Sequence, residues 1–187
     1  MVCREFKFCY LRPPRTATKS ITLELRGRYD VEYPVSQENA GHKTEWRPEF
    51  SGFFTFIVVR NPFSRVVSLW RRSQESPYYR PRSGLSFREF LEDCQNCSKW
   101  PLPCHAYTQA PLINRVVRFE NLAEDLALLP YEHFPEKLEL VTRKGESTYP
   151  KPWWEEYDEE TVAAVQKVWS VDFRVYGYSL KLEDAIS

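Results

Sequence analysis

The run from Phe53 to Val59 (FFTFIVV) constrains the fold most, because it is apolar at almost every position. A strand with one face in water alternates apolar and polar residues, whereas a strand covered on both faces is apolar nearly throughout. Helices on the two sides of a parallel sheet are the usual source of such cover. The run therefore predicts a central strand in an α/β fold.

Shorter segments extend this pattern of strand and helix along the 187 residues. The expected strands are 4–11, 53–59 and 115–119. The first expected helix is capped by Thr16 or Thr18 and ends near residue 27. The other expected helices cover 62–72, 87–91, 121–129 and 158–176. Strands that alternate with helices favour a parallel sheet flanked by helices. We expect one α/β domain over residues 1–187, with a variable insertion or lid at about 73–112.

The glycine content excludes two common nucleotide-binding motifs. The chain has 6 glycines, and no two have the spacing of G-x-G-x-x-G or G-x-x-x-x-G-K-[ST]. A dinucleotide fingerprint and a standard Walker A loop are therefore absent.

Charge and hydropathy restrict the partners and the location. Lys and Arg total 26, as do Asp and Glu, so the net charge is zero. Such a chain is not a general binder of nucleic acids or membrane surfaces. It has no apolar run of transmembrane length, and its first residues (MVCREFKF) lack the apolar core of a signal peptide. We expect a cytoplasmic protein without a membrane segment.

Residues 13–20 (PPRTATKS) predict a phosphate site between a buried strand and a helix. The backbone N–H groups at a helix N-terminus favour an anion. Arg15 and Lys19 would add positive charge, and the hydroxyls of Thr16, Thr18 and Ser20 would add hydrogen bonds. The alternative is an ordinary solvated helix start with basic residues nearby.

The end of the central strand predicts a second anion site. Arg60 follows the strand, Asn61-Pro62 reads as a helix start, and Ser68 lies on that helix. Alternatively, Arg60 is a structural ion-pair partner and Ser68 a small packing residue. Ligands of open α/β sheets bind beyond the carboxyl ends of the strands. Two anion sites there predict one ligand with a phosphate at each end.

Both segments resemble motifs of sulfotransferases that use 3′-phosphoadenosine 5′-phosphosulfate (PAPS). Residues 14–21 (PRTATKSI) look like the family's 5′-phosphosulfate loop, commonly P-K-T-[AG]-S-T-S-[FL]. Residues 58–68 (VVRNPFSRVVS) are similar to its 3′-phosphate motif, V-R-[DN]-P-x-x-R-x-x-S. Arg15 stands where the family commonly has lysine, and Lys19 where it has serine or threonine.

Three later segments extend the likeness. GHKT at 41–44 and RFENL at 118–122 resemble the uronyl 2-O-sulfotransferase-like branch, which acts on carbohydrates. RKG at 143–145 is similar to the late basic loop that closes over the nucleotide. The likeness covers residues 8–178 apart from 73–112, and it implies a P-loop-like sheet.

The resemblance implies sulfuryl transfer from PAPS to an acceptor hydroxyl of a carbohydrate or small molecule, with adenosine 3′,5′-bisphosphate (PAP) as the product and no metal. It implies His42 as the base, with Glu24 as its rival, and Arg15 and Lys19 as the groups that stabilise the transferred charge. The residues implied in nucleotide binding are Arg15, Thr16, Ala17, Thr18, Lys19, Ser20, Arg60, Ser68, Arg143, Lys144 and Gly145.

Two other functions stay open on the sequence alone. Lys19-Ser20 mimics the end of a Walker A loop, so a P-loop-like small-molecule kinase is the rival enzyme, although Pro13 and Thr18 occupy its glycine positions. A nucleotide- or glycan-binding protein of the same fold without catalysis is the other.

The cysteines leave a separate question open. Cys94, Cys97 and Cys104, with His105, form a possible tetrahedral zinc set. Free thiols and a local disulfide are the alternatives.

Overall fold

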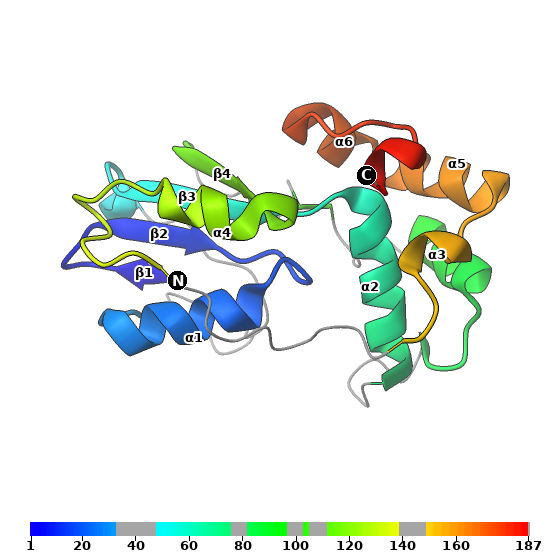
Figure 1. Cartoon of the computed structure of the whole chain (residues 1–187), viewed down its shortest axis with the longest axis horizontal. Helices are drawn as coiled ribbons and strands as arrows, with labels where there is room; N and C mark the ends of the chain where they lie inside the picture. The colour runs from blue at the N-terminus through cyan, green and yellow to red at the C-terminus, as the bar shows by residue number, and fades with distance from the viewer. Residues whose placement is uncertain (33–47, 76–81, 97–102, 105–111, 139–148, 187) are drawn as a thin grey trace. The chain divides into compact units, whose positions relative to one another are not determined.

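The computed structural model describes residues 1–32, 48–75, 82–96, 103–104, 112–138 and 149–186 (Figure 1). The chain divides into two compact units. Met1–Arg60 and Ala106–Ser147 form the sheet unit, and Asn61–His105 and Thr148–Ser187 form the helical unit. The mostly parallel sheet and its flanking helices confirm the predicted α/β class. The single domain over 1–187 and the insertion at 73–112 stay predictions.

The sheet has four strands in the order β1-β2-β3-β4. The two-residue β1 (Val2–Cys3) runs antiparallel to β2 (Phe8–Leu11), which is parallel to β3 (Phe54–Val59), and β3 is parallel to β4 (Arg115–Arg118). Because β3 lies between β2 and β4, the prediction of a central strand is confirmed. The strand expected over 4–11 begins only at Phe8, because residues 4–7 form a turn in which Lys7 has a φ of 51°.

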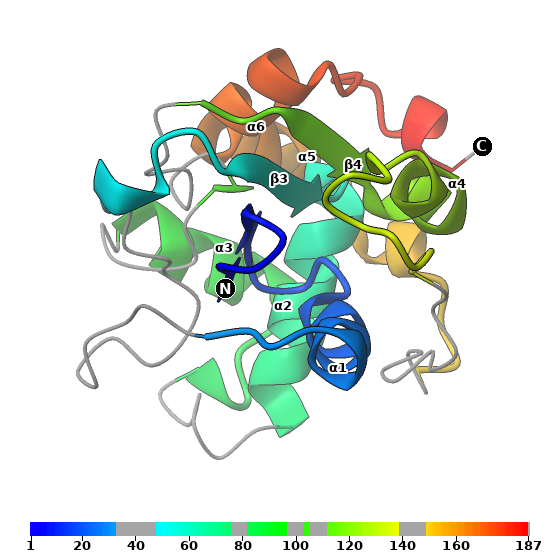
Figure 2. The ribbon, with the colours of Figure 1, turned by 90° about the vertical axis from the view of Figure 1, so that its left-hand side faces the viewer.

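One face of this sheet is covered by α1 (Thr18–Arg28) and α4 (Leu122–Ala127), which Figure 2 shows on the same side of the strands. Alternate strand residues point to this face, as the two-residue period of a strand requires. They pack with buried residues of both helices in one cluster that includes Phe8, Tyr10, Ile21, Leu25, Phe56, Val58, Val117 and Leu126. Ile21 and Leu25, which are four residues apart on α1, both lie in this core.

The helical unit contains α2 (Pro62–Glu75), α3 (Phe87–Asn96), α5 (Glu159–Val168) and α6 (Ser170–Tyr176). The predicted helix start is confirmed, because the Asn61 side chain accepts a hydrogen bond from the backbone N–H of Phe63 at 3.0 Å. The helices share an apolar core that includes Phe63, Val66, Phe90, Val165, Trp169 and Phe173.

The helix predicted over 158–176 is two helices, and this part of the prediction was wrong. Asp158 forms a capping box with Thr161 at the start of α5, so the predicted start of this helix is confirmed. The helix ends before Trp169, whose φ of −106° and ψ of 20° are not helical. Trp169 is fully buried in the core of the helical unit, so packing of this large ring fixes the break.

A buried ion pair lies inside the helical unit. Arg65 Nη1 is 3.8 Å from Asp172 Oδ2, and the two side chains are 0% and 1% exposed. Asp172 Oδ2 also accepts a hydrogen bond from the backbone N–H of Cys104 at 2.5 Å. Arg65 is the second arginine of the 58–68 motif, and its burial on α2 gives it a structural role.

Within the described part of the chain, no helix is long and apolar enough to cross a membrane.

Candidate phosphate-binding site at the carboxyl ends of the strands

The loop between β2 and α1 adopts a conformation that usually requires glycine. Arg15 has a φ of 68° and Ala17 a φ of 56°, both in the left-handed region that residues with a Cβ seldom occupy. Such strain persists where the surrounding structure imposes it, and it is concentrated at functional sites. Left-handed residues in a turn direct successive N–H groups toward one concave side, which suits an anion.

Thr16 and Thr18 hold the loop rather than cap the helix. Each Oγ1 donates a hydrogen bond to the Pro13 carbonyl oxygen at 2.7 Å. The N-cap residue is Ala17, and no side chain caps the helix, so the predicted cap by Thr16 or Thr18 was wrong. The spacing of the hydroxyls was consistent with a cap, but the left-handed turn at Ala17 directs them back into the loop.

The charges around the helix start favour an anion. The first turn of α1 contains no acidic residue, and its N–H groups have no acceptor within the helix. Burial raises the pKa of the Tyr10 hydroxyl, which lies beside Thr18, so it stays neutral. Arg15 is half-buried and Lys19 exposed, so both cations reach the surface of this loop.

Arg60 joins this loop to the ends of the two neighbouring strands. It follows β3 directly, and its Nη1 donates a hydrogen bond to the Arg15 carbonyl oxygen at 3.4 Å. Its guanidinium carbon lies 4.3 Å from the centre of the Phe119 ring, and Phe119 follows β4 directly. Arg60 therefore lies beside the loop that contains Arg15, at the carboxyl edge of the sheet unit. The Phe119 contact was not predicted.

A comparison with protein families matches residues 2–179 to the sulfotransferase family. The chain belongs to this family. The match confirms the resemblance that the two motifs carry, although it does not distinguish the carbohydrate branch from others. Comparisons with curated proteins and with solved structures gave no match.

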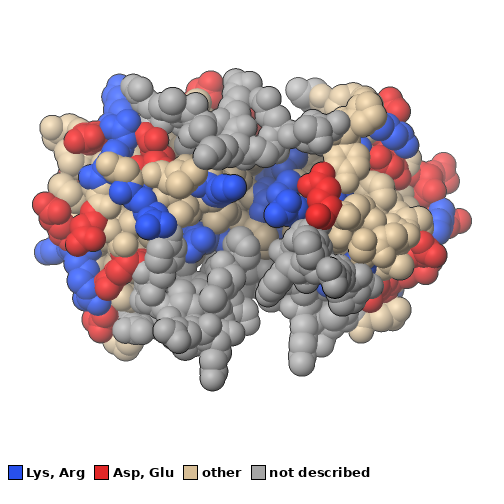
Figure 3. Space-filling view, turned by 90° about the horizontal axis from the view of Figure 1, so that it is seen from below, with Lys and Arg blue, Asp and Glu red and all other residues tan. Residues whose placement is uncertain are grey.

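The described loop of this sulfotransferase fits a phosphate-containing donor. A phosphosulfate is an anion, and the helix start offers uncapped N–H groups, a left-handed turn and two cations. The face of the sheet unit seen in Figure 3, to which α1 contributes, bears several Lys and Arg side chains with acidic ones among them. Because the net charge of the chain is zero, positive charge at this loop comes from individual side chains such as Arg15 and Lys19.

The structure brings together only some of the predicted site residues. Arg15, Thr16, Ala17, Thr18, Lys19 and Ser20 form the loop and first turn of α1, with Arg60 against them. Ser68 is half-buried on α2, in the helical unit. His42, Arg143, Lys144 and Gly145 lie outside the described residues, so their roles stay predictions.

Two further expectations concern Glu24 and the cysteines. Glu24, the rival base, is on α1 and forms an ion pair with Arg28 at 2.7 Å.

Cys94 and Cys104 are buried in the helical unit, while Cys97 and His105 lie outside the described residues. The described residues contain no cluster of metal ligands. A disulfide or zinc site at 94–105 therefore stays an untested hypothesis.

Proposed function

We propose that this sulfotransferase moves the sulfuryl group of PAPS to a hydroxyl of a carbohydrate or of a small molecule. The contact between Arg60 and the 13–17 loop supports this most strongly, because it brings the cation of Arg60 next to the loop that contains Arg15 at one edge of the sheet. PAPS has a 5′-phosphosulfate and a 3′-phosphate on one ribose, so it needs two adjacent anion sites. ATP has all its phosphates at one end.

Different residues of the chain would bind the two ends of PAPS. The N–H groups of the loop and the cations of Arg15 and Lys19 would hold the 5′-phosphosulfate and neutralise charge on the oxygen that leaves. Arg60 would bind the 3′-phosphate, and Ser68 and the basic segment 143–145 are expected to contribute to nucleotide binding. The acceptor oxygen forms a bond to sulfur as the bond between sulfur and the phosphate oxygen breaks, and PAP is released.

His42 is the proposed base that takes the proton from the acceptor hydroxyl. The ion pair between Glu24 and Arg28 favours this assignment, because it holds the Glu24 carboxylate against a side chain of its own helix. We expect His42→Ala to slow transfer while PAP binding stays unchanged, and Glu24→Gln to have a smaller effect on transfer. A larger loss of transfer in Glu24→Gln than in His42→Ala would reverse the assignment.

Transfer of labelled sulfate tests the proposal itself. The protein is incubated with PAPS labelled in the sulfuryl group and with a panel of oligosaccharides, monosaccharides and phenols. We expect label on the carbohydrates or on a small-molecule alcohol, and none when labelled phosphate is offered as ATP. Phosphoryl transfer from ATP would instead favour a kinase, and PAP binding without any transfer would favour a binding protein.

A further inference from the structure

Phe119 lies under the guanidinium group of Arg60 because of the register of the sheet. Val59 on β3 is paired with Arg118 on β4, so the next residues, Arg60 and Phe119, leave the two strands side by side. The separation of 4.3 Å between the guanidinium carbon and the ring centre is within the range of a cation–π contact. Phe119 is half-buried and packs against the core of the sheet unit, which holds the ring in place.

This contact is made by the face of the guanidinium, not by its edge. The N–H donors of arginine lie in the plane of the group, so a stacked arginine can still bind a phosphate through two of them. Nη1 also donates to the Arg15 carbonyl oxygen at 3.4 Å. Ring and carbonyl together restrict a long side chain that would otherwise lose considerable freedom on binding an anion.

We propose that Phe119 is a positioning residue for Arg60 and thereby sets the preference of the site for ligands with a second phosphate. The inference rests on the proposed function, because it assumes that Arg60 binds the 3′-phosphate. It assigns no contact with the nucleotide to Phe119 itself. Without the ring, Arg60 keeps its charge and its hydrogen bond to the Arg15 carbonyl oxygen but loses one of its two restraints. More of its ordering must then come from the ligand, which weakens the binding only of ligands that have that phosphate.

The test compares the Kd of PAP with the Kd of 5′-AMP, which lacks the 3′-phosphate, by calorimetry. We expect Phe119→Leu and Phe119→Met to weaken PAP binding roughly three- to tenfold, the cost of ordering one long side chain. The Kd of 5′-AMP should stay unchanged. Phe119→Tyr retains a ring face and should bind PAP as the unmodified protein does. Tyr131→Leu, which changes an aromatic residue that is 77% exposed in the same unit, is the matched control.

Arg60→Ala provides the decisive background for this test. If Phe119 acts through Arg60, adding Phe119→Leu to Arg60→Ala should weaken PAP binding no further. Equal losses for PAP and 5′-AMP in Phe119→Leu, or an additive loss in the double variant, would overturn the inference and leave the proposed function standing. Equal affinity of the unmodified protein for PAP and 5′-AMP would instead refute the proposed function, and this inference with it.

Discussion

Replacing Asp172 with alanine is expected to lower the free energy of unfolding by about 3–5 kcal/mol, the usual cost of removing one partner from a buried ion pair. The guanidinium of Arg65 is 0% exposed, so water cannot replace the lost carboxylate. The backbone N–H of Cys104 also loses its acceptor, Asp172 Oδ2. The charge of Arg65, rather than the volume of the aspartate, dominates the expected loss.

Urea unfolding of three variants separates the charge effect from simple loss of packing. Asp172→Ala should be far less stable than the double variant Arg65→Met with Asp172→Leu, because the double variant leaves no buried charge. Glu160→Ala removes a carboxylate that is 77% exposed and paired with Arg88, and should change stability little. A double variant no more stable than Asp172→Ala would show that the ion pair is not the source of the loss.

Replacing Arg15 with alanine is expected to slow sulfuryl transfer by about 10²–10³-fold, the typical cost of losing one preorganised electrostatic contact in an active site. The substitution is well suited to isolate the charge. Position 15 has a φ of 68°, which is equally unfavourable for arginine and alanine, and Ala17 already occupies the same region at 56°. Backbone strain should therefore change little.

Arg15→Lys is the matched variant, because it restores the residue that the resemblance places in this loop. It should keep the transfer rate within about tenfold of the original, since its positive charge is retained. Arg26→Ala, in the last turn of α1, removes an exposed cation from the same helix and should leave the rate unchanged. Loss of transfer in Arg26→Ala equal to that in Arg15→Ala would mean that only net charge matters.

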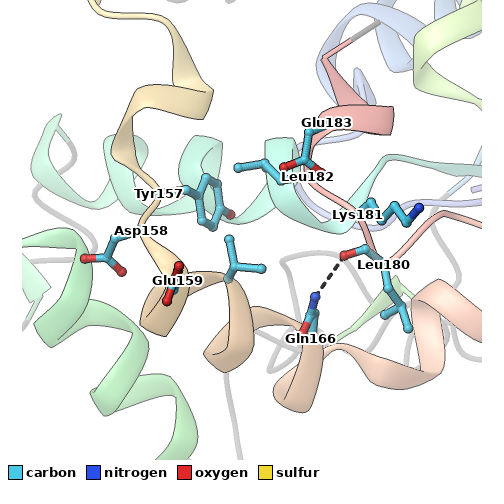
Figure 4. A pocket seen from close by; sticks show the side chains of 9 residues that line it. Tyr157, Asp158, Glu159, Gln166, Leu180, Lys181, Leu182 and Glu183 are labelled. Atoms are coloured by element: carbon cyan, nitrogen blue, oxygen red, sulfur yellow. Dashed lines mark hydrogen bonds between the residues drawn. The ribbon is translucent and has the colours of Figure 1, made fainter.

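The helical unit contains a pocket that was not predicted. Figure 4 shows it beside α5, with Tyr157, Asp158, Gln166 and Leu182 among its lining residues. Gln166 Nε2 donates across it to the Leu180 carbonyl oxygen at 2.8 Å. No motif in the sequence predicted this pocket, and none of the predicted site residues lines it.

Local patterns predicted the elements whose causes are local. The apolar run 53–59 became β3, and the Asn61-Pro62 pair started α2, because burial on both faces and a side-chain cap are visible in consecutive residues. The break at Trp169 was missed, since it depends on where a large ring packs. A periodic pattern does not contain that information.

The candidate site shows the same limit. The residue types in 13–20 and the position of Arg60 directly after a strand predicted two cationic positions at strand ends. The loop and Arg60 do lie at one edge of the sheet unit. The left-handed turn at Ala17 could not be predicted, because alanine seldom adopts it without tertiary support. The Arg60–Phe119 contact depends on pairing of strands that are far apart in the sequence.

Calorimetric titration of the unmodified protein and of Arg60→Ala with PAP, 5′-AMP and ATP measures whether the site recognises the 3′-phosphate through Arg60. We expect the unmodified protein to bind PAP more tightly than the other two nucleotides. Arg60→Ala should weaken PAP binding roughly ten- to hundredfold, the range for a lost hydrogen bond between charged groups, and leave 5′-AMP binding unchanged. Unchanged PAP affinity in Arg60→Ala, or tighter binding of ATP than of PAP by the unmodified protein, would refute the role of Arg60 in a PAPS site.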